Sequence, residues 1–230
     1  MSREAPAPVR NDAIASIRRR ISSGEWGPGT RLPREADLAG ELGVSRGSLR
    51  EAVSGLALAR VLDVRQGDGT YVSSLDAYDL LEPVRSATSL MRGQAVLDLF
   101  AVRRILEPEA AAITARSADD DVRRGLRAEL ERMHAAGDRV DLLLEADNAF
   151  HELIARAPGN PVLHSLLGSL SMSTAQARAW HGMADRSVLD ETRAEHESIC
   201  AAIEAGDAEL ARAATTIHIA TNERWLRANA

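Results

Sequence analysis

The sequence of 230 residues contains no lysine, a single cysteine and only 3% aromatic side chains. All 28 basic residues are arginine, whose planar guanidinium suits carboxylate and phosphate groups. The lone Cys200 excludes an internal disulfide framework and is typical of a reducing compartment. No apolar run approaches the roughly 18 residues needed to cross a membrane, and no hydrophobic signal segment begins the sequence. We therefore expect a cytoplasmic protein.

Charge is distributed unevenly along the chain, which has a net charge of −6. Residues 1–75 contain 11 arginines and 9 acidic residues, a net +2, whereas residues 76–230 contain 17 arginines and 25 acidic residues, a net −8. A mildly basic module joined to an acidic one indicates nucleic-acid contact at one end only. The length and the 45% apolar content predict one large or two modest globular domains.

The first 75 residues have the pattern of three helices followed by a β-hairpin. Glycine-containing turns separate the apolar repeats, and Ser45 occupies the N-cap position of the third helix. The predicted helices cover residues 10–23, 35–42 and 46–58, and the predicted strands cover residues 61–64 and 71–72. A helix-turn-helix with a trailing hairpin is a winged helix, whose recognition helix contacts DNA with its first turns.

Short motifs in this region resemble the GntR-type bacterial transcription regulators. They appear in the family's order between Val9 and Val72, as Pro28-Gly29-Thr30-Arg31-Leu32-Pro33, Leu38-Ala39, Gly43-Val44-Ser45-Arg46, Arg50-Glu51-Ala52 and Gly67-Asp68-Gly69-Thr70. The resemblance implies a DNA-binding domain over residues 8–74 and a double-stranded DNA operator as partner. It further implies DNA contacts from the start of the third helix, a later arginine and the wing tip, which correspond to Ser45, Arg46, Ser48, Arg50 and Gly67.

The candidate DNA contacts have separable roles. Arg46 can bind guanine O6 and N7 in a bidentate way, a contact worth about 1–3 kcal/mol of discrimination, whereas Ser45 and Ser48 suit phosphate oxygens. Family members often have a basic residue where this sequence has Ala36, and Arg34 is the candidate replacement for that phosphate contact. The alternative is that these arginines only solvate a helix surface.

The remainder of the chain is helical in pattern. Residues 75–92 are polar, contain Pro83 and predict a linker with a short helix. Residues 93–228 predict an antiparallel helical bundle with no strand, so the expected fold class is mostly α with one small β-hairpin. The predicted helices of the bundle cover residues 94–116, 119–136, 139–157, 161–181, 187–205 and 207–228.

Several ionisable residues share the predicted core faces of the bundle helices. The face of the first helix comprises Val96, Leu99, Arg103, Leu106, Ala110 and Ile113, and that of the last comprises Leu210, Ala214, Ile217, His218, Thr221 and Trp225. Two middle helices contribute Asp147, His151 and His196. A buried charge must be paired or bound to metal, and three imidazoles with one carboxylate suit zinc, nickel, iron or manganese with coordination positions left open. The alternative is that these are hydrogen-bonded core histidines.

Residues 90–225 resemble the FCD ligand-binding domain of the FadR branch of that family. The matching residues are Val102-Arg103, Leu106-Glu107-Pro108-Glu109-Ala110-Ala111, Asp147 with Phe150-His151, Glu195-His196, Ile199, Ile203, Gly206-Asp207 and His218. In that domain a metal ion and a core arginine together hold a small organic carboxylate. The resemblance therefore implies that Arg103 is the carboxylate clamp and that the metal ligands are Asp147, His151, His196 and His218.

Two further assignments concern neighbours of these residues. Asn222 lies one turn beyond His218 and is a candidate effector contact. Arg103 has Glu107 four residues on as an alternative partner, but the Arg-before-Glu order is the weaker orientation and does not require an inward position, so we favour the clamp.

We therefore predict a metabolite-responsive transcription regulator, a repressor, with a divalent metal ion as cofactor and zinc as the first candidate. A homodimer is expected because such modules read two-fold related half-sites. The main alternative is a metal-dependent enzyme acting on a small carboxylate. Ala155 and Cys200 stand four residues after His151 and His196, where a zinc protease motif would have its second histidine, so the sequence disfavours the enzyme.

Overall fold

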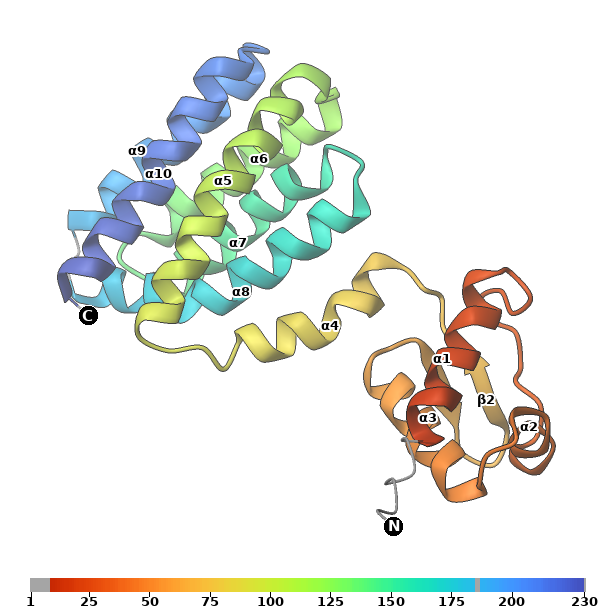
Figure 1. The fold of residues 1–230 in the computed structure, drawn as a ribbon. Coiled ribbons are helices and arrows are strands. Elements are labelled where there is room, and N and C mark those ends of the chain that lie inside the picture. Colours follow the sequence, from red (N-terminus) through yellow and green to blue (C-terminus); the bar gives the residue numbers. More distant parts are fainter. Residues whose placement is uncertain (1–8, 185–186, 230) are drawn as a thin grey trace. The chain divides into compact units, whose positions relative to one another are not determined.

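The computed structural model describes residues 9–184 and 187–229, with side chains described for residues 11–174 and 188–229. It divides into two compact units, Met1–Pro83 and Val84–Ala230, each described by itself (Figure 1). Residue 8, where the predicted DNA-binding domain begins, lies outside the described residues.

The first unit is a small winged helix. Its elements are α1 (Val9–Ser22), α2 (Glu35–Leu42), α3 (Arg46–Leu58), β1 (Leu62–Arg65) and β2 (Gly69–Val72). The two strands are antiparallel, with Leu62 opposite Val72, and Arg31 forms an isolated bridge to Tyr71 beside them. The predicted three helices and hairpin are confirmed, and each predicted end lies within two residues of the observed end. The core beneath them is formed by Ile17, Trp26, Leu32, Leu38, Leu49, Leu56, Leu62 and Val72.

Local capping fixes where α2 and α3 meet. Gly43 ends α2 in the left-handed region (φ 66°), which favours glycine because it has no Cβ. Ser45 then caps α3, since its Oγ accepts a hydrogen bond of 3.0 Å from the backbone N–H of Ser48. The tight turn brings α2 close to α3 and exposes the first turn of α3.

Helix α4 (Ala77–Thr88) spans the boundary between the two units and contains Pro83. The short helix predicted within residues 75–92 is present, and it continues past Pro83 to Thr88. Pro83 has no N–H for the carbonyl of Asp79, so one helical hydrogen bond is lost without ending the helix.

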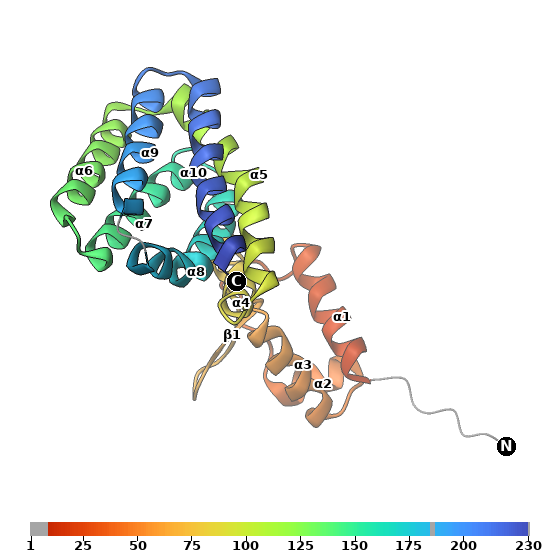
Figure 2. The same ribbon diagram turned by 90° about the vertical axis from the view of Figure 1, so that its left-hand side faces the viewer.

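In the residues that the structure describes, the second unit is an antiparallel bundle of six helices, which Figure 2 shows side by side. Helix α10 packs along α5 and α9, α6 packs on α7, and α7 packs on α8. The lone cysteine, Cys200, is buried in this core, and burial raises the pKa of its thiol to about 11. The elements are α5 (Gln94–Ser117), α6 (Asp120–Ala136), α7 (Val140–Arg156), α8 (Pro161–Ala184), α9 (Ser187–Glu204) and α10 (Ala208–Asn229).

Two predicted core faces need correction. On α10, Leu210 and Ile217 are 53% and 58% exposed, because the helix instead buries Ala211, Thr215 and Ile219. On α5, Glu107 is buried although the sequence assigned it no inward position. Both helices carry apolar residues on several sides, so periodicity alone allowed more than one inward stripe.

Candidate functional site

The residues predicted to contact DNA lie on α3, the start of α2 and the wing. Arg34 is the N-cap residue of α2 and is exposed, as is Arg46 in the first turn of α3. Arg46 makes no ion pair with any described residue, so its guanidinium is available to a ligand. Ser45 and Ser48 share a hydrogen bond of 2.9 Å between their hydroxyls and hold the helix start.

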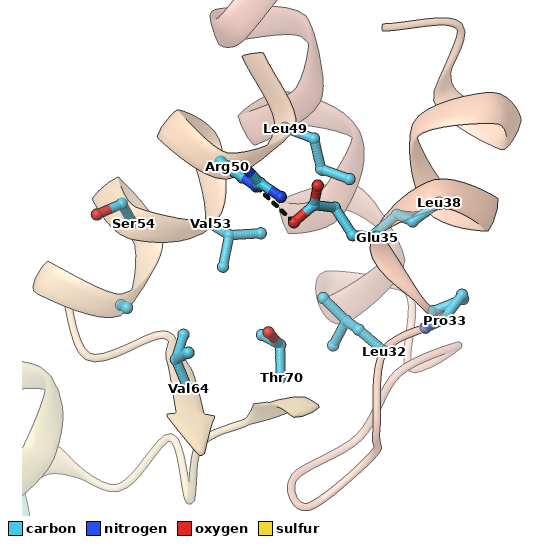
Figure 3. A pocket seen from close by; sticks show the side chains of 11 residues that line it. Leu32, Pro33, Glu35, Leu38, Leu49, Arg50, Val53, Ser54, Val64 and Thr70 are labelled. Atoms are coloured by element: carbon cyan, nitrogen blue, oxygen red, sulfur yellow. Dashed lines mark hydrogen bonds and ion pairs between the residues drawn. The ribbon is translucent and has the colours of Figure 1, made fainter. Parts of the chain in front are cut away.

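Arg50, one turn further along α3, has a partner that the sequence analysis did not identify. Its Nε donates a hydrogen bond of 2.7 Å to Oε2 of Glu35, the first residue of α2, and this bond raises the pKa of Arg50 (Figure 3). The pair lies at an open pocket of about 390 Å³ between α2, α3 and the wing. The pocket is lined mainly by apolar side chains, including Leu32, Leu49 and Val53.

The wing is ordered by side chains near its tip. Gly67 adopts a φ of 77° in the turn, and the hydroxyl of Tyr71 donates a hydrogen bond of 2.9 Å to Oδ2 of Asp68. Arg31 donates to the backbone carbonyl of Asp68, and the Arg65 guanidinium stacks 4.3 Å from the centre of the Tyr71 ring. Two arginines therefore flank the wing tip in addition to the predicted Gly67.

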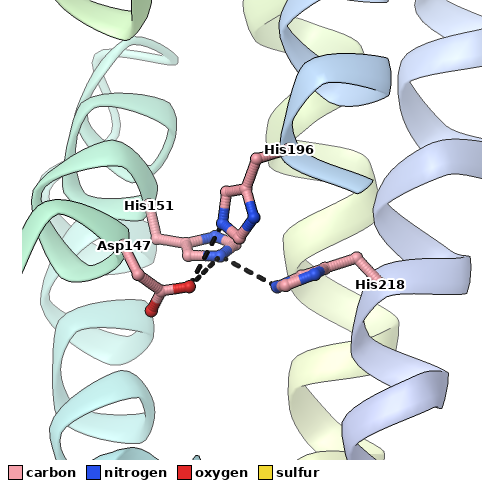
Figure 4. A group of neighbouring side chains, drawn as sticks. All are labelled: Asp147, His151, His196 and His218. Atoms are coloured by element: carbon pink, nitrogen blue, oxygen red, sulfur yellow. Dashed lines mark hydrogen bonds and ion pairs between the residues drawn. The ribbon is translucent and has the colours of Figure 1, made fainter. Parts of the chain in front are cut away.

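The second unit brings together the four residues predicted as metal ligands. Asp147 and His151 project from one face of α7, His196 from α9 and His218 from α10, and all four are buried (Figure 4). One candidate ligand atom from each lies within 4.8 Å of the others. Nε2 of His196 is 3.1 Å from Oδ1 of Asp147, and Nε2 of His151 is 3.2 Å from Nε2 of His218.

The opposite nitrogen of each imidazole is held by an oxygen atom. Nδ1 of His196 lies 2.7 Å from the carbonyl of Thr192, Nδ1 of His218 lies 2.9 Å from Oε2 of Glu195, and Nδ1 of His151 lies 3.3 Å from Oε2 of Glu107. Such contacts fix the tautomer with the proton on Nδ1 and direct Nε2 into the cluster, an arrangement typical of metal-binding histidines.

The protonation state of His151 also fits a metal ion. Burial holds the pKa of His151 well below its usual range, so that ring is neutral at pH 7, which is the form that binds metals. Three imidazoles and one carboxylate form the donor set of zinc and its first-row neighbours. The described residues therefore fit a divalent cation that they could hold with four ligand atoms.

Arg103 is fully buried, but its main contact differs from the one favoured from the sequence. Its Nε donates a hydrogen bond of 2.5 Å to Oε1 of Glu107, the alternative partner, and its Nη1 donates one of 2.8 Å to Oγ1 of Thr174 on α8. The sequence argument set this pair aside as one that needs no inward position, but the pair is formed and both residues are inside the bundle. Among the described residues, nothing accepts a hydrogen bond from the buried Nη2 of Arg103.

Glu107 is ionised in this environment. Burial alone would raise the pKa of its carboxyl, but the adjacent Arg103 guanidinium, together with His151 and His218, outweighs burial and lowers the pKa to about 2. The carboxylate contacts both Arg103 and His151, so it connects the arginine to the histidine cluster. The signal for it in the sequence was its spacing of four residues from Arg103.

Asn222, the remaining effector candidate, is buried on α10. Its Nδ2 donates a hydrogen bond of 3.3 Å to the backbone carbonyl of His218, one turn earlier on the same helix. Glu195, which precedes His196, was matched to the FCD domain but given no role, because a residue beside an inward one is expected at the helix surface; in the structure it contacts His218.

None of the helices within the described ranges has the length and apolar character needed to cross a membrane.

Comparisons with known proteins assign both units to families. Residues 10–72 match the bacterial regulatory proteins of the gntR family, and residues 98–221 match the FCD domain. The HTH-type transcriptional regulator LutR of Bacillus subtilis is 30% identical over 207 residues, which cover 88% of this chain and 94% of LutR. The galactonate operon transcriptional repressor of Escherichia coli is 27% identical over 221 residues, covering 93% and 95% of the two chains.

Solved structures give the same result. A Streptococcus agalactiae GntR protein superposes with a TM-score of 0.65 at 30% sequence identity, covering 94% of this chain and 99% of its own. Escherichia coli McbR/YncC, at 19% identity and a TM-score of 0.55, shares the fold. LutR, the galactonate repressor and the gntR family are described as transcription regulators, not enzymes. The chain belongs to the GntR family of DNA-binding transcription regulators and carries an FCD domain.

Proposed function

We propose that this regulator is a repressor whose FCD domain binds a divalent metal ion, with zinc as the first candidate, and a small organic carboxylate that changes its affinity for operator DNA. The observation that carries the proposal is the buried cluster of Asp147, His151, His196 and His218 with Arg103 held by Glu107 in the same bundle.

The metal ion would provide open coordination positions for a carboxylate. Asp147 and the three histidines would hold the ion through one carboxylate oxygen and three Nε2 atoms, with each Nδ1 already in contact with an oxygen. This leaves room in the coordination sphere for an anionic ligand.

Arg103 would hold the same ligand by charge-assisted hydrogen bonds. Its Nε and Nη1 are engaged by Glu107 and Thr174, whereas Nη2 is buried and has no acceptor among the described residues. A buried guanidinium N–H without an acceptor is costly, and a carboxylate oxygen would satisfy it. Asn222 stays a candidate for a further polar contact.

The names of relatives support this class of effector. They include the galactonate operon repressor and a putative L-lactate dehydrogenase operon regulatory protein of Escherichia coli, both named for operons that concern hydroxy acids. The galactonate regulator is a repressor by name, which favours repression for this chain as well.

We further propose that a homodimer reads the operator through α3 and the wing. Arg46, which has no ion-pair partner among the described residues, would read a base, while Ser45, Ser48 and Arg34 would contact phosphates. Arg50 and the backbone of Gly67 would complete the contacts from α3 and the wing tip.

A thermal-shift screen tests the effector site. The zinc-loaded protein is melted with a panel of hydroxy acids, sugar acids and dicarboxylates, and any hit is tested for its effect on DNA affinity. A hit should stabilise the wild-type protein and not the Arg103→Ala variant. Stabilisation of both proteins alike would place the ligand elsewhere and contradict the assignment of Arg103.

A further inference from the structure

The carboxylate of Glu107 lies between two parts of the proposed effector site. Its Oε1 accepts a hydrogen bond from Nε of Arg103, and its Oε2 is 3.3 Å from Nδ1 of His151. All three side chains are almost completely buried, so water does not screen the charges from one another. One carboxylate therefore serves both the candidate clamp and a candidate metal ligand.

We propose that Glu107 is a positioning residue that couples Arg103 to the metal centre, an inference that rests on the metal site proposed above. A carboxylate on Nδ1 makes an imidazole a stronger metal ligand, because it fixes the tautomer and raises the basicity of Nε2. The guanidinium of Arg103 attracts the same carboxylate and so reduces the basicity that Glu107 gives to Nε2 of His151. Arg103 thereby lowers the affinity for metal although it contributes no ligand atom.

The coupling has a consequence for regulation. An effector carboxylate that neutralises Arg103 releases Glu107 to act on His151 and so strengthens metal binding, in addition to any direct coordination. Linkage then requires that the metal strengthen effector binding by the same factor. Metal and effector would therefore bind this domain cooperatively.

Glu195 provides a matched control within the same cluster. Its Oε2 contacts Nδ1 of His218 at 2.9 Å, as Glu107 contacts His151, but its Oε1 accepts from the neutral hydroxyl of Thr221 at 2.8 Å. Glu195 therefore supports a histidine without Arg103 on its other oxygen.

The test measures zinc affinity alone, by competition with a chromophoric chelator in a buffer free of carboxylates, on the full-length chain. Glu107→Gln should lower zinc affinity about 10–100-fold, as loss of such support does elsewhere. Arg103→Gln should raise it on the order of tenfold, because the Glu107 carboxylate then acts on His151 without competition from the guanidinium. This gain should disappear in the Glu107→Gln background and persist in the Glu195→Gln background.

Two results would overturn the coupling. A gain of equal size with and without Glu107 would mean that Arg103 repels the metal directly, and no gain from Arg103→Gln would mean that it does not act on the metal. If Arg103→Gln alone does not fold, the comparison of Glu107→Gln with the double variant remains decisive. Their zinc affinities should be equal, and a tighter double variant would contradict the inference.

One further variant separates the failure of this inference from failure of the metal site itself. If His196→Ala binds zinc as well as the wild-type protein does, the cluster is not a zinc site, and both proposals fail. If His196→Ala loses zinc but Arg103→Gln raises zinc affinity equally with and without Glu107, only the coupling fails.

Discussion

Nε2 of His151 lies 3.2 Å from Nε2 of His218 in the interior of the bundle. The Nδ1 atoms of both rings face glutamate oxygens, so neither Nε2 carries a proton in the tautomer that these contacts favour. Two lone pairs at this separation repel one another unless a proton or a cation lies between them. The folded bundle thus holds an arrangement that a cation would stabilise.

Metal binding should accordingly raise the melting temperature of the protein. At a free zinc concentration about 100 times the dissociation constant, the stabilisation is about 2.7 kcal/mol, or roughly 5–10 °C for a chain of this size. Differential scanning fluorimetry with and without a chelator measures the shift. His196→Ala should abolish it, and an undiminished shift in that variant would contradict the metal site.

The stability of the metal-free protein should fall when the pH is lowered below about 6.5. Burial lowers the pKa of His151 in the folded state, so near and below pH 6.5 the unfolded chain takes up a proton that the folded chain does not. The free energy of unfolding therefore rises with pH within this window and levels off above it. Urea titrations between pH 5 and 8 measure the slope, which should be smaller in His151→Asn.

Glu107 contributes in a different pH range. Its pKa is lowered to about 2 in the folded state, so its stabilising contribution is complete above the usual glutamate range and is lost as the pH falls toward 2. Glu107→Gln should be less stable than the wild-type protein at pH 7, and the difference should shrink in acid. A difference that stays constant down to pH 3 would show that the carboxylate charge is not what stabilises the fold.

Replacing Arg46 should reduce sequence-specific DNA binding. Arg46→Ala removes a candidate guanine contact worth about 1–3 kcal/mol, which is about 5–150-fold in the ratio of operator to non-specific affinity. Gel-shift titrations on a duplex selected by the wild-type protein measure this ratio. Arg19→Ala, an exposed arginine of α1, removes the same charge and should leave the ratio unchanged. If both variants lower the ratio equally, Arg46 contributes only its positive charge and does not read a base.

The two roles of Ser45 can be separated by substitution. Ser45→Ala should destabilise the winged helix by about 1 kcal/mol, because the hydrogen bond from Ser48 N–H to the cap is lost. Ser45→Asp retains a capping oxygen and should restore stability, but it places a negative charge where a phosphate contact is proposed. DNA binding by Ser45→Asp at wild-type strength would exclude Ser45 from the interface.

Much of this structure was predictable because its signals are local. Glycine stops and capping residues gave the helix ends, as at Gly43 and Ser45, and helical spacing placed Asp147 and His151 on one face of α7. The inward faces of their own helices predicted His196 and His218 as core residues, and the family resemblance then implied that they join Asp147 and His151 in one metal site, since the sequence alone does not fix how separate helices pack.

What the sequence did not reveal depends on contacts between or within tightly packed helices. Glu35 pairs with Arg50 across a helix junction, and Glu195 reaches His218 on a neighbouring helix. Glu107 was recognised as a neighbour of Arg103, but an exposed pair and a buried one have the same spacing. Burial depends on the whole bundle, as the exposed Leu210 and Ile217 also illustrate.

The thiol of Cys200 is unreactive in the folded protein. A buried thiol with a pKa of about 11 carries almost no thiolate at neutral pH. Maleimides and other alkylating reagents should therefore not modify Cys200 in the folded state. A single cysteine introduced on an exposed surface, such as the wing, would then be the sole site of labelling. Fluorophores or spin labels could follow each domain in the native chain without first removing its own cysteine.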